Sequence, residues 1–247
     1  MTPGVGAAMT GSLPHNARGA YGRLVDALLW SALELSVLSR LPPGFTFLTI
    51  GGRDGRWNRS IATRWPDSTG VHLHGDVGDV ADRLSGRTFD LVFTTHHLLG
   101  FVADPQDVIG VLARLLSLDG LMVSFLPSRW HAAFGDLCRG DVEGAERSLT
   151  GREWAASEAP YRHLFTPGEI RAMHTSSRMN VEVLTGFPSL VHPQHEGVSL
   201  EGLLSDEAVF RRVLAMESEL LIDPDAGARG ANFLVTASHA DARSRRR

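Results

Sequence analysis

The sequence predicts an α/β protein in which a mostly parallel sheet is covered by helices on both faces. Three short runs, residues 45–50, 89–95 and 121–126, are apolar almost throughout and predict strands. Apolar runs without alternation are typical of strands buried on both faces. Segments with the helical spacing of apolar residues lie between these strands. Strands that alternate with helices form right-handed βαβ units and hence a parallel sheet.

The first predicted strand ends in a glycine-rich turn, residues 51–55, that opens a short helix ended by Pro66. Glycines let the backbone approach a ligand closely, and the N-terminus of the next helix presents free N–H groups and a positive dipole end. The turn therefore indicates a nucleotide-type cofactor site. Arg53 occupies the middle glycine position of a full G-x-G-x-x-G pattern, so an ordinary tight turn is the alternative.

Helices and one further strand complete the N-terminal half. Leu24, Leu28 and Leu35 follow helical spacing and predict a packing helix over residues 21–41, ended by two prolines. The sequence also predicts a strand at 70–74, a short helix at 77–84 and an amphipathic helix at 105–118.

The regular pattern lapses between residues 127 and 165, which we interpret as a lid segment rich in aromatic residues and histidines. Helical signals return at Thr166, where a capping residue is followed by proline and then by Glu169 at the third helical position. The sequence then predicts a strand at 181–185, an amphipathic helix at 205–221 and a final strand at 232–237.

Composition favours one soluble domain over residues 17–238, between a flexible tail at 1–16 and a basic tail at 239–247. The net charge of −4 argues against a nucleic-acid binder, although the basic tail leaves RNA as a weak alternative. All 24 basic residues are arginine, which excludes a catalytic lysine. A single cysteine, Cys138, excludes an internal disulfide and fits a reducing compartment. With neither a signal peptide nor a membrane-spanning run in the sequence, we expect a cytoplasmic protein and no membrane partner.

The order of elements resembles the class I S-adenosylmethionine (SAM)-dependent methyltransferases over residues 20–238. Four parts of the chain carry the resemblance: the glycine turn at 47–55, the strand and rim at 89–99, the turn into a strand at 115–123, and the late helix and strand at 163–170 and 181–186. The resemblance implies a Rossmann-like, doubly wound sheet of six or seven strands with an antiparallel last strand. It also implies methyl transfer from SAM to a small molecule, which we place in specialised metabolism.

The sequence departs from the family at the cofactor site. Thr49 stands where the family has an acidic residue, and the link from the first strand to residue 89 is short enough that one strand or helix is missing. If the strand at 70–74 is strand two, His72 replaces the carboxylate that grips the ribose hydroxyls. If it is strand three, Asp76 takes the place of the adenine-contacting carboxylate, and the position of Asp76 shortly before residue 89 favours this second assignment.

The resemblance implies a cofactor site made of eight residues: Gly51, Gly52, Arg53, Asp54, Gly55, His72, Asp76 and Thr95. His72 and His74 alternate on the predicted strand, so both imidazoles would face one side, as two metal ligands would. Since the spacing dictates no third ligand, we predict no metal. The alternative to a metal site is that one histidine lines the cofactor site and the other packs under a helix.

The catalytic base is predicted to be His96 or His97, because both follow a buried strand at the carboxyl edge of the sheet, where open α/β sheets bind ligands. A histidine can accept a substrate proton near neutral pH. A structural role for either histidine is the alternative.

The acceptor is predicted to lie against the start of the lid segment and its far end. The candidate residues are Arg129, Trp130, His131, Tyr161 and His163. The arginine would pair with a carboxylate or phosphate, and the aromatic rings would wall an apolar substrate. The alternative is that these aromatic side chains only bury the lid against the core.

A second hypothesis is a methyltransferase-like protein that has lost methyl transfer. Such a protein would act as a binding or scaffolding partner, or catalyse a different reaction at the same site. Thr49, Arg53 and the short link to residue 89 favour it, whereas the histidines at the sheet edge favour a working site. A homodimer or a complex with a partner protein is left open by the sequence.

Overall fold

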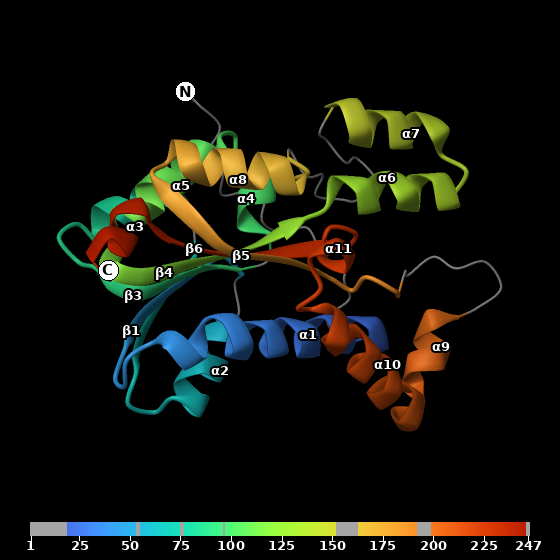
Figure 1. The fold of residues 1–247 in the computed structure, drawn as a ribbon, viewed down its shortest axis with the longest axis horizontal. Coiled ribbons are helices and arrows are strands. Elements are labelled where there is room, and N and C mark those ends of the chain that lie inside the picture. The colour runs from blue at the N-terminus through green and yellow to red at the C-terminus, as the bar shows by residue number, and fades with distance from the viewer. Residues whose placement is uncertain are drawn as a thin grey trace.

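The structure, a computed structural model, places a six-stranded sheet between two layers of helices (Figure 1). Helices α1 (Ala20–Ser36), α2 (Arg56–Arg64) and α10 (Glu207–Leu220) cover one face, and α5 (Pro105–Ala113) and α8 (Pro167–Ser176) cover the other. The α/β class predicted from the sequence is confirmed. The structure describes residues 19–52, 55–74, 77–95, 97–151, 163–191 and 199–245.

The sheet has the strand order β2-β1-β3-β4-β6-β5. Neighbours among the first four strands are parallel, whereas β6 is antiparallel to both β4 and β5. The six strands with an antiparallel last strand are those predicted. Their bounds are β1 (Thr46–Ile50), β2 (Thr69–Leu73), β3 (Phe89–Thr94), β4 (Leu116–Pro127), β5 (Met179–Phe187) and β6 (Asn232–His239).

Each face of the sheet has its own apolar core, which explains the continuous apolar runs. Successive side chains of a strand point to opposite faces, so Phe47 packs with α1 and α2 while Leu48 packs with α5. Both side chains are completely buried. A strand in this position therefore has a nearly continuous apolar run and not an alternating pattern.

The remaining described helices are short and connect these layers. No helix within the described ranges is long and apolar enough to cross a membrane. Their bounds are η2 (Leu38–Arg40), α3 (Val77–Arg83), α4 (Leu98–Phe101), α6 (Arg129–Cys138), α7 (Val142–Glu146), η3 (Arg147–Gly151), α9 (Leu200–Ser205), α11 (Pro224–Gly227) and η4 (Ala240–Arg245).

Local capping explains where α5 and α8 begin. The Asp104 carboxylate accepts hydrogen bonds from the first free N–H groups of α5, and proline occupies the first turn. The predicted capping box of α8 is confirmed, because Thr166 and Glu169 each accept from the other's backbone N–H.

The helix predicted over 105–118 is too long, because α5 ends at Ala113 and β4 already begins at Leu116. Leu116 pairs with Phe89 of β3. Ser117 donates a hydrogen bond to Asp90, with 3.1 Å between Oγ and Oδ1. The two leucines at 115 and 116 are apolar in either conformation, so pairing with β3, not the apolar pattern, ends the helix.

The segment predicted to lack regular structure contains helices α6 and α7 and the π-helical turn η3, which we call the arm (residues 129–151). Figure 1 shows α6 continuing from β4 beyond the end of the sheet, with α7 beside it. Ser128 and Asp141 cap the two helices. Inside the arm, the buried Asp136 carboxylate pairs with Arg139 and accepts a hydrogen bond from Ser148 at 2.8 Å.

The predicted tail at 239–247 is also partly structured. Strand β6 extends to His239, and the chain then forms the 3₁₀ helix η4. Ala240 donates a backbone hydrogen bond to the carbonyl of Arg178, and Ala242 is buried. Backbone pairing with β5 and the turn before it therefore orders residues that composition alone assigned to a tail. The tail predicted at 1–16 lies outside the described residues.

Candidate functional site

The glycine turn lies where the strand order reverses. From β1 the chain crosses to β2 on one side, and from β2 it returns to β3 on the other side of β1. Ligands of open α/β sheets bind outside the carboxyl ends of the strands at such a switch point. The turn and the residues after β3 therefore form the candidate cofactor region.

The geometry of this turn requires glycine. Gly51, Gly52 and Gly55 have φ values of +98°, +62° and +57°, which favour glycine strongly. A Cβ atom on Gly51 would lie 2.9 Å from the carbonyl oxygen of Thr95. The Thr95 N–H in turn donates to the carbonyl of Ile50 at 2.9 Å, so the ends of β1 and β3 are held close together.

Helix α2 begins directly after the turn. Its N-cap, Gly55, has no side chain to accept from the first N–H groups, unlike the caps of α5 and α8. Arg56 pairs with both carboxylate oxygens of Asp26 on α1, at 2.8 and 2.9 Å. This bidentate pair fixes α2 against α1.

The His72 side chain supports the turn from β2. Its Nδ1 lies 2.9 Å from Oγ1 of Thr49, and its Nε2 lies 2.9 Å from the carbonyl oxygen of Gly52. Because a carbonyl only accepts, Nε2 carries the proton, and in the neutral ring Nδ1 accepts from the threonine hydroxyl. A Cβ atom on Gly55 would lie 3.0 Å from the imidazole. Thr49 and His72, the two residues that depart from the family pattern, are thus bonded to each other.

The assignment of residues 70–74 to strand three is wrong. Strand β2 pairs directly with β1, with Thr49 opposite His72. In the doubly wound order the strand next to the first is the second, and the third lies outside it. The described sheet has no strand beyond β2. The strand that is missing is therefore the third, and His72 stands on strand two.

His97 occupies an unusual position at the end of β3. Its φ of +57° is in the left-handed region, and its side chain is buried at the start of α4. The imidazole stacks on Phe125 of β4 with 4.6 Å between ring centroids, and Phe125 stacks on Phe187 of β5 at 5.8 Å. The sequence reasoning missed both phenylalanines, although each is an aromatic residue at the carboxyl end of a predicted strand.

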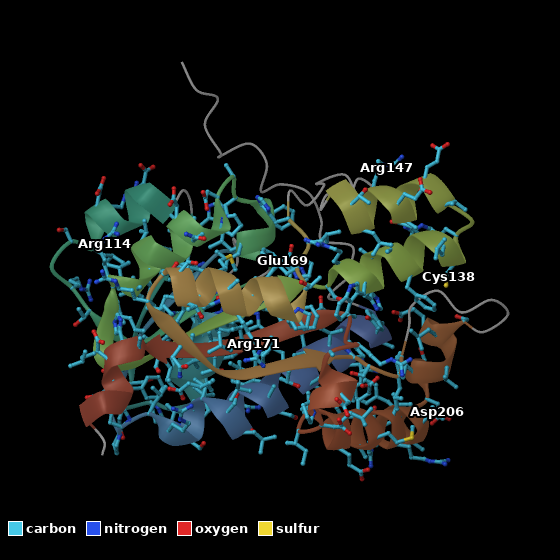
Figure 2. All side chains as sticks on the ribbon, turned by 45° about the horizontal axis from the view of Figure 1, so that its top comes forward. Arg114, Cys138, Arg147, Glu169, Arg171 and Asp206 are labelled. Carbon is cyan, nitrogen blue, oxygen red and sulfur yellow. The ribbon has the colours of Figure 1, made fainter. Side chains whose placement is uncertain are left out.

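Arg129, at the base of the arm, is hydrogen-bonded to other residues of the protein. One guanidinium nitrogen donates to Glu169 of α8 at 2.7 Å and to the carbonyl of Leu164 at 3.0 Å, and the side chain is 11% exposed. Burial opposes ionisation of Glu169, but hydrogen bonds from Arg129 and Thr166 outweigh it and lower the pKa of that carboxyl. Figure 2 shows Glu169 on α8 and Arg147 out on the arm.

The structure describes three of the other predicted acceptor residues, Trp130, His131 and His163. Trp130, on the first turn of α6, is 46% exposed. The backbone N–H of His131 donates to the Ser128 hydroxyl. His163 donates its backbone N–H to Gly100 and bonds the carbonyl of Ala103 through Nε2, at 3.0 Å each. His163 thereby ties the end of the lid segment to α4.

Five predicted site residues lie outside the described residues: Arg53, Asp54, Asp76, His96 and Tyr161. Among the residues that are described, no group of three histidine, cysteine or acidic side chains could hold a metal ion.

A buried carboxylate near the same sheet edge was not anticipated. Glu217 of α10 is 1% exposed and accepts three backbone hydrogen bonds, from Ser189 at 2.8 Å and from Leu190 and Val191 at 2.9 Å. Burial raises the pKa of the nearby Tyr21 hydroxyl, and the charge of Glu217 adds to this effect. The sequence signal was a charged residue within the apolar stripe of the helix predicted at 205–221.

Similarity to solved structures concerns the whole fold. The plantazolicin methyltransferase BpumL, solved with S-adenosylhomocysteine (SAH), is 13% identical with a TM-score of 0.51, and the match covers 90% of this chain and 85% of BpumL. A protein described as a sarcosine dimethylglycine methyltransferase from Galdieria sulphuraria is 14% identical with a TM-score of 0.50, covering 88% of this chain and 86% of that one. No protein-family model and no curated protein matches the sequence. The chain therefore has the α/β fold of the class I SAM-dependent methyltransferases.

Proposed function

We propose that this protein transfers a methyl group from SAM to a small molecule. The observation that carries the proposal is the crowded glycine turn at the switch point between β1 and β3. Ligands of open α/β sheets bind at this point. The similarity of the fold to methyltransferases, one of them solved with SAH, selects SAM from among the ligands that such a turn could take.

The residues present fit such a cofactor. Gly51, Gly52 and Gly55 keep side chains away from the turn, and the uncapped N–H groups of α2 suit a carboxylate. Thr95 borders the turn from the end of β3. His72 bonds the turn from β2, Arg53 and Asp54 belong to the turn in the sequence, and Asp76 follows β2 in the sequence. When bound, SAM would supply a methyl group on an electrophilic sulfonium.

For an acceptor that must lose a proton, we propose His97 or its neighbour His96 as the base. Stacking on Phe125 holds the ring of His97 in one orientation beside the ends of β3 and β4. Methyl transfer is an in-line substitution, so the protein must chiefly align the acceptor and, where needed, remove its proton.

The acceptor would lie towards the arm. Trp130 and His131 of α6, with Tyr161 and His163 from the lid segment, are the proposed contacts. The Nη2 atom of Arg129 donates to Glu169 and to the carbonyl of Leu164, and no hydrogen bond of Nη1 is found in the described part of the chain. Nη1 would bind an anionic group on the acceptor.

Calorimetric titration with SAM and SAH tests the cofactor proposal. We expect micromolar binding to the unmodified protein and none to Gly52→Val, because a β-branched residue is strained at this positive φ and would reshape the turn. Gly86→Val is the matched control, since Gly86 also has a positive φ, of +80°, but faces open space outside the site. If the unmodified protein binds neither compound, the proposal is wrong.

One observation favours the second hypothesis, a protein with the methyltransferase fold that binds a partner or performs other chemistry. The positions at which the resemblance implies carboxylates are held by Thr49 and His72, which bond each other. A protein of this kind would keep the fold without cofactor binding, so the same titration separates the two hypotheses.

A further inference from the structure

We propose that His72 is a positioning residue that holds the glycine turn in its ligand-binding shape, and that it is not itself a ligand of the cofactor. The inference rests on the proposed function, because the shape of the turn matters only if a cofactor binds there. It departs from the family resemblance, which would use this position of strand two to grip the ribose.

Both nitrogens of the imidazole are already engaged. Nδ1 is bonded to Oγ1 of Thr49 on β1, and Nε2 donates to the carbonyl of Gly52 in the turn, at 2.9 Å each. An imidazole has two polar atoms, so a ribose hydroxyl could bond His72 only by displacing one of these partners. The side chain thus connects two strands and the turn through a single ring.

The His72 ring also packs against the glycine turn. A Cβ atom on Gly55 would lie 3.0 Å from Cδ2 of His72, so the imidazole packs directly against the residue that begins α2. The backbone N–H of Gly51 donates to the carbonyl of Leu73, the neighbour of His72 on β2, at 3.2 Å. Strand β2 therefore contacts the turn at Gly51, Gly52 and Gly55.

Such support is needed because glycines are flexible. Three glycines with positive φ lie within five residues, and each samples many conformations when it is not held. A turn that is already ordered loses less conformational entropy when its ligand binds, which increases affinity without any new contact. Thr49 has a part in this arrangement because its hydroxyl is completely buried and orients the imidazole.

The two histidines of β2 then differ in role. His74, one residue beyond the strand, is exposed, and no hydrogen bond or ion pair involving it is found within the described ranges. Of the two imidazoles that the sequence placed on one side of the strand, His72 is the one that packs against the start of a helix.

Two substitutions of His72 separate its two bonds. In His72→Gln the amide nitrogen takes the place of Nε2 and keeps the donor to Gly52. In His72→Asn the shorter side chain places its amide near the position of Nδ1, where the oxygen can accept from Thr49, and the donor to Gly52 is lost. By calorimetry we expect SAH to bind the glutamine variant within about 3-fold of the unmodified protein and the asparagine variant at least about 10-fold more weakly. Equal affinity of the two variants, whether both weak or both unchanged, would overturn the proposal.

Two measurements on the ligand-free protein keep the test independent of the proposed function. The ¹⁵N chemical shifts of the His72 ring should show a proton on Nε2 and an acceptor at Nδ1, and Thr49→Val should change the Nδ1 shift. Amide exchange at Gly51 and Gly52 should accelerate in His72→Asn but not in His72→Gln. Thr94→Val is the control, because Thr94 is also buried, on the adjacent strand, but bonds the carbonyl of Val123.

The outcomes are distinguishable. If the unmodified protein binds no SAH but shows the expected tautomer and exchange pattern, the proposed function fails and the support of the turn by His72 stands. If SAH binds but the ring carries its proton on Nδ1, or exchange at the turn is unchanged in the asparagine variant, the support of the turn fails and the proposed function stands.

Discussion

The glycine turn and the arm lie beyond the same edge of the sheet, yet they are built in opposite ways. At the turn, side chains and backbone face inward and bond one another, as His72 does with Thr49 and Gly52. On the arm, small residues face inward, and Trp130, Phe134 and Leu137 face solvent. The difference is compatible with the proposed function, in which the turn holds the cofactor and the start of the arm contacts the acceptor.

Helix α6 of the arm differs from an ordinary amphipathic helix, because its large apolar side chains are exposed. Residues 130, 134 and 137 follow the i, i+4, i+7 spacing of one helix face, and that face is about half exposed. The buried residues of α6 are Ala132, Ala133, Gly135 and Asp136. The exposed face begins at the residue after Arg129, next to the carboxyl end of β4, where we place the acceptor.

The largest expected contrast is between two phenylalanines. Phe125→Ala should reduce the free energy of unfolding by about 3–5 kcal/mol, because the ring is buried between His97 and Phe187. Phe134→Ala, on the exposed face of α6, should cost less than about 1 kcal/mol. Urea denaturation measures both. Similar costs would mean that the arm is packed as tightly as the sheet edge.

A second contrast uses two glycines with left-handed backbones. Gly51→Ala should cost about 2–4 kcal/mol, because its Cβ atom meets the carbonyl of Thr95 in addition to the backbone strain. Gly140→Ala, between α6 and α7, should cost only about 1 kcal/mol, because its φ is +76° but its Cβ atom would meet nothing within 4 Å. A larger loss of stability in the arm variant would reverse the comparison.

A third contrast concerns ion pairs at the base and the tip of the arm. Arg129→Met should reduce the free energy of unfolding by about 1–3 kcal/mol, because it leaves Glu169 partly buried without its partner. Arg147→Met should change it by less than about 0.5 kcal/mol, since Arg147 and Glu143 are exposed and 4.0 Å apart. Denaturation at low and high salt checks both, and only the tip variant should lose its effect in salt.

The smallest expected effect is a pH dependence of stability that arises on α8, outside both regions. Burial lowers the pKa of His174 on α8, and its Nε2 is buried with no hydrogen-bond partner among the described residues. The unfolded chain takes up this proton below about pH 6.5, before the folded protein does, so stability falls as the pH decreases from 6.5. The slope is at most about 1.4 kcal/mol per pH unit.

His174→Gln should remove this part of the acid sensitivity, as measured by denaturation between pH 7 and pH 5.5. The control is His163→Gln at the end of the lid segment, because the Nε2 of His163 has a partner in the carbonyl of Ala103, and the slope should stay that of the unmodified protein. An unchanged slope in His174→Gln would show that the buried imidazole does not govern acid stability.

Much of the fold was predictable because short segments of the sequence indicate their own secondary structure. Continuous apolar runs predicted β1, β3 and β4, and the Thr166 capping box predicted the start of α8. The arm was not predictable by the same rule, because its buried residues are small and its large apolar residues are exposed. The end of α5 depended on pairing between Leu116 and Phe89, which are distant in the sequence.

The candidate site was predictable in place but not in detail. The glycine turn and the residues after β3 could be located, because they follow predicted strands. Periodicity placed His72 and His74 on one side of β2 but could not tell which was bonded, since that depends on Thr49 of another strand. Glu217 escaped notice because its partners, the N–H groups of residues 189–191, belong to the backbone and leave no sequence signal.

The most direct test of the account is a crystal structure of the protein with SAH. The account predicts SAH against the turn of Gly51, Gly52 and Gly55 and beside Thr95, with His72 still bonded to Thr49 and to the Gly52 carbonyl. It also predicts that the sulfur points towards His97 and the start of α6. SAH bound elsewhere, or a His72 ring turned away from Gly52 to bond the ribose, would contradict it.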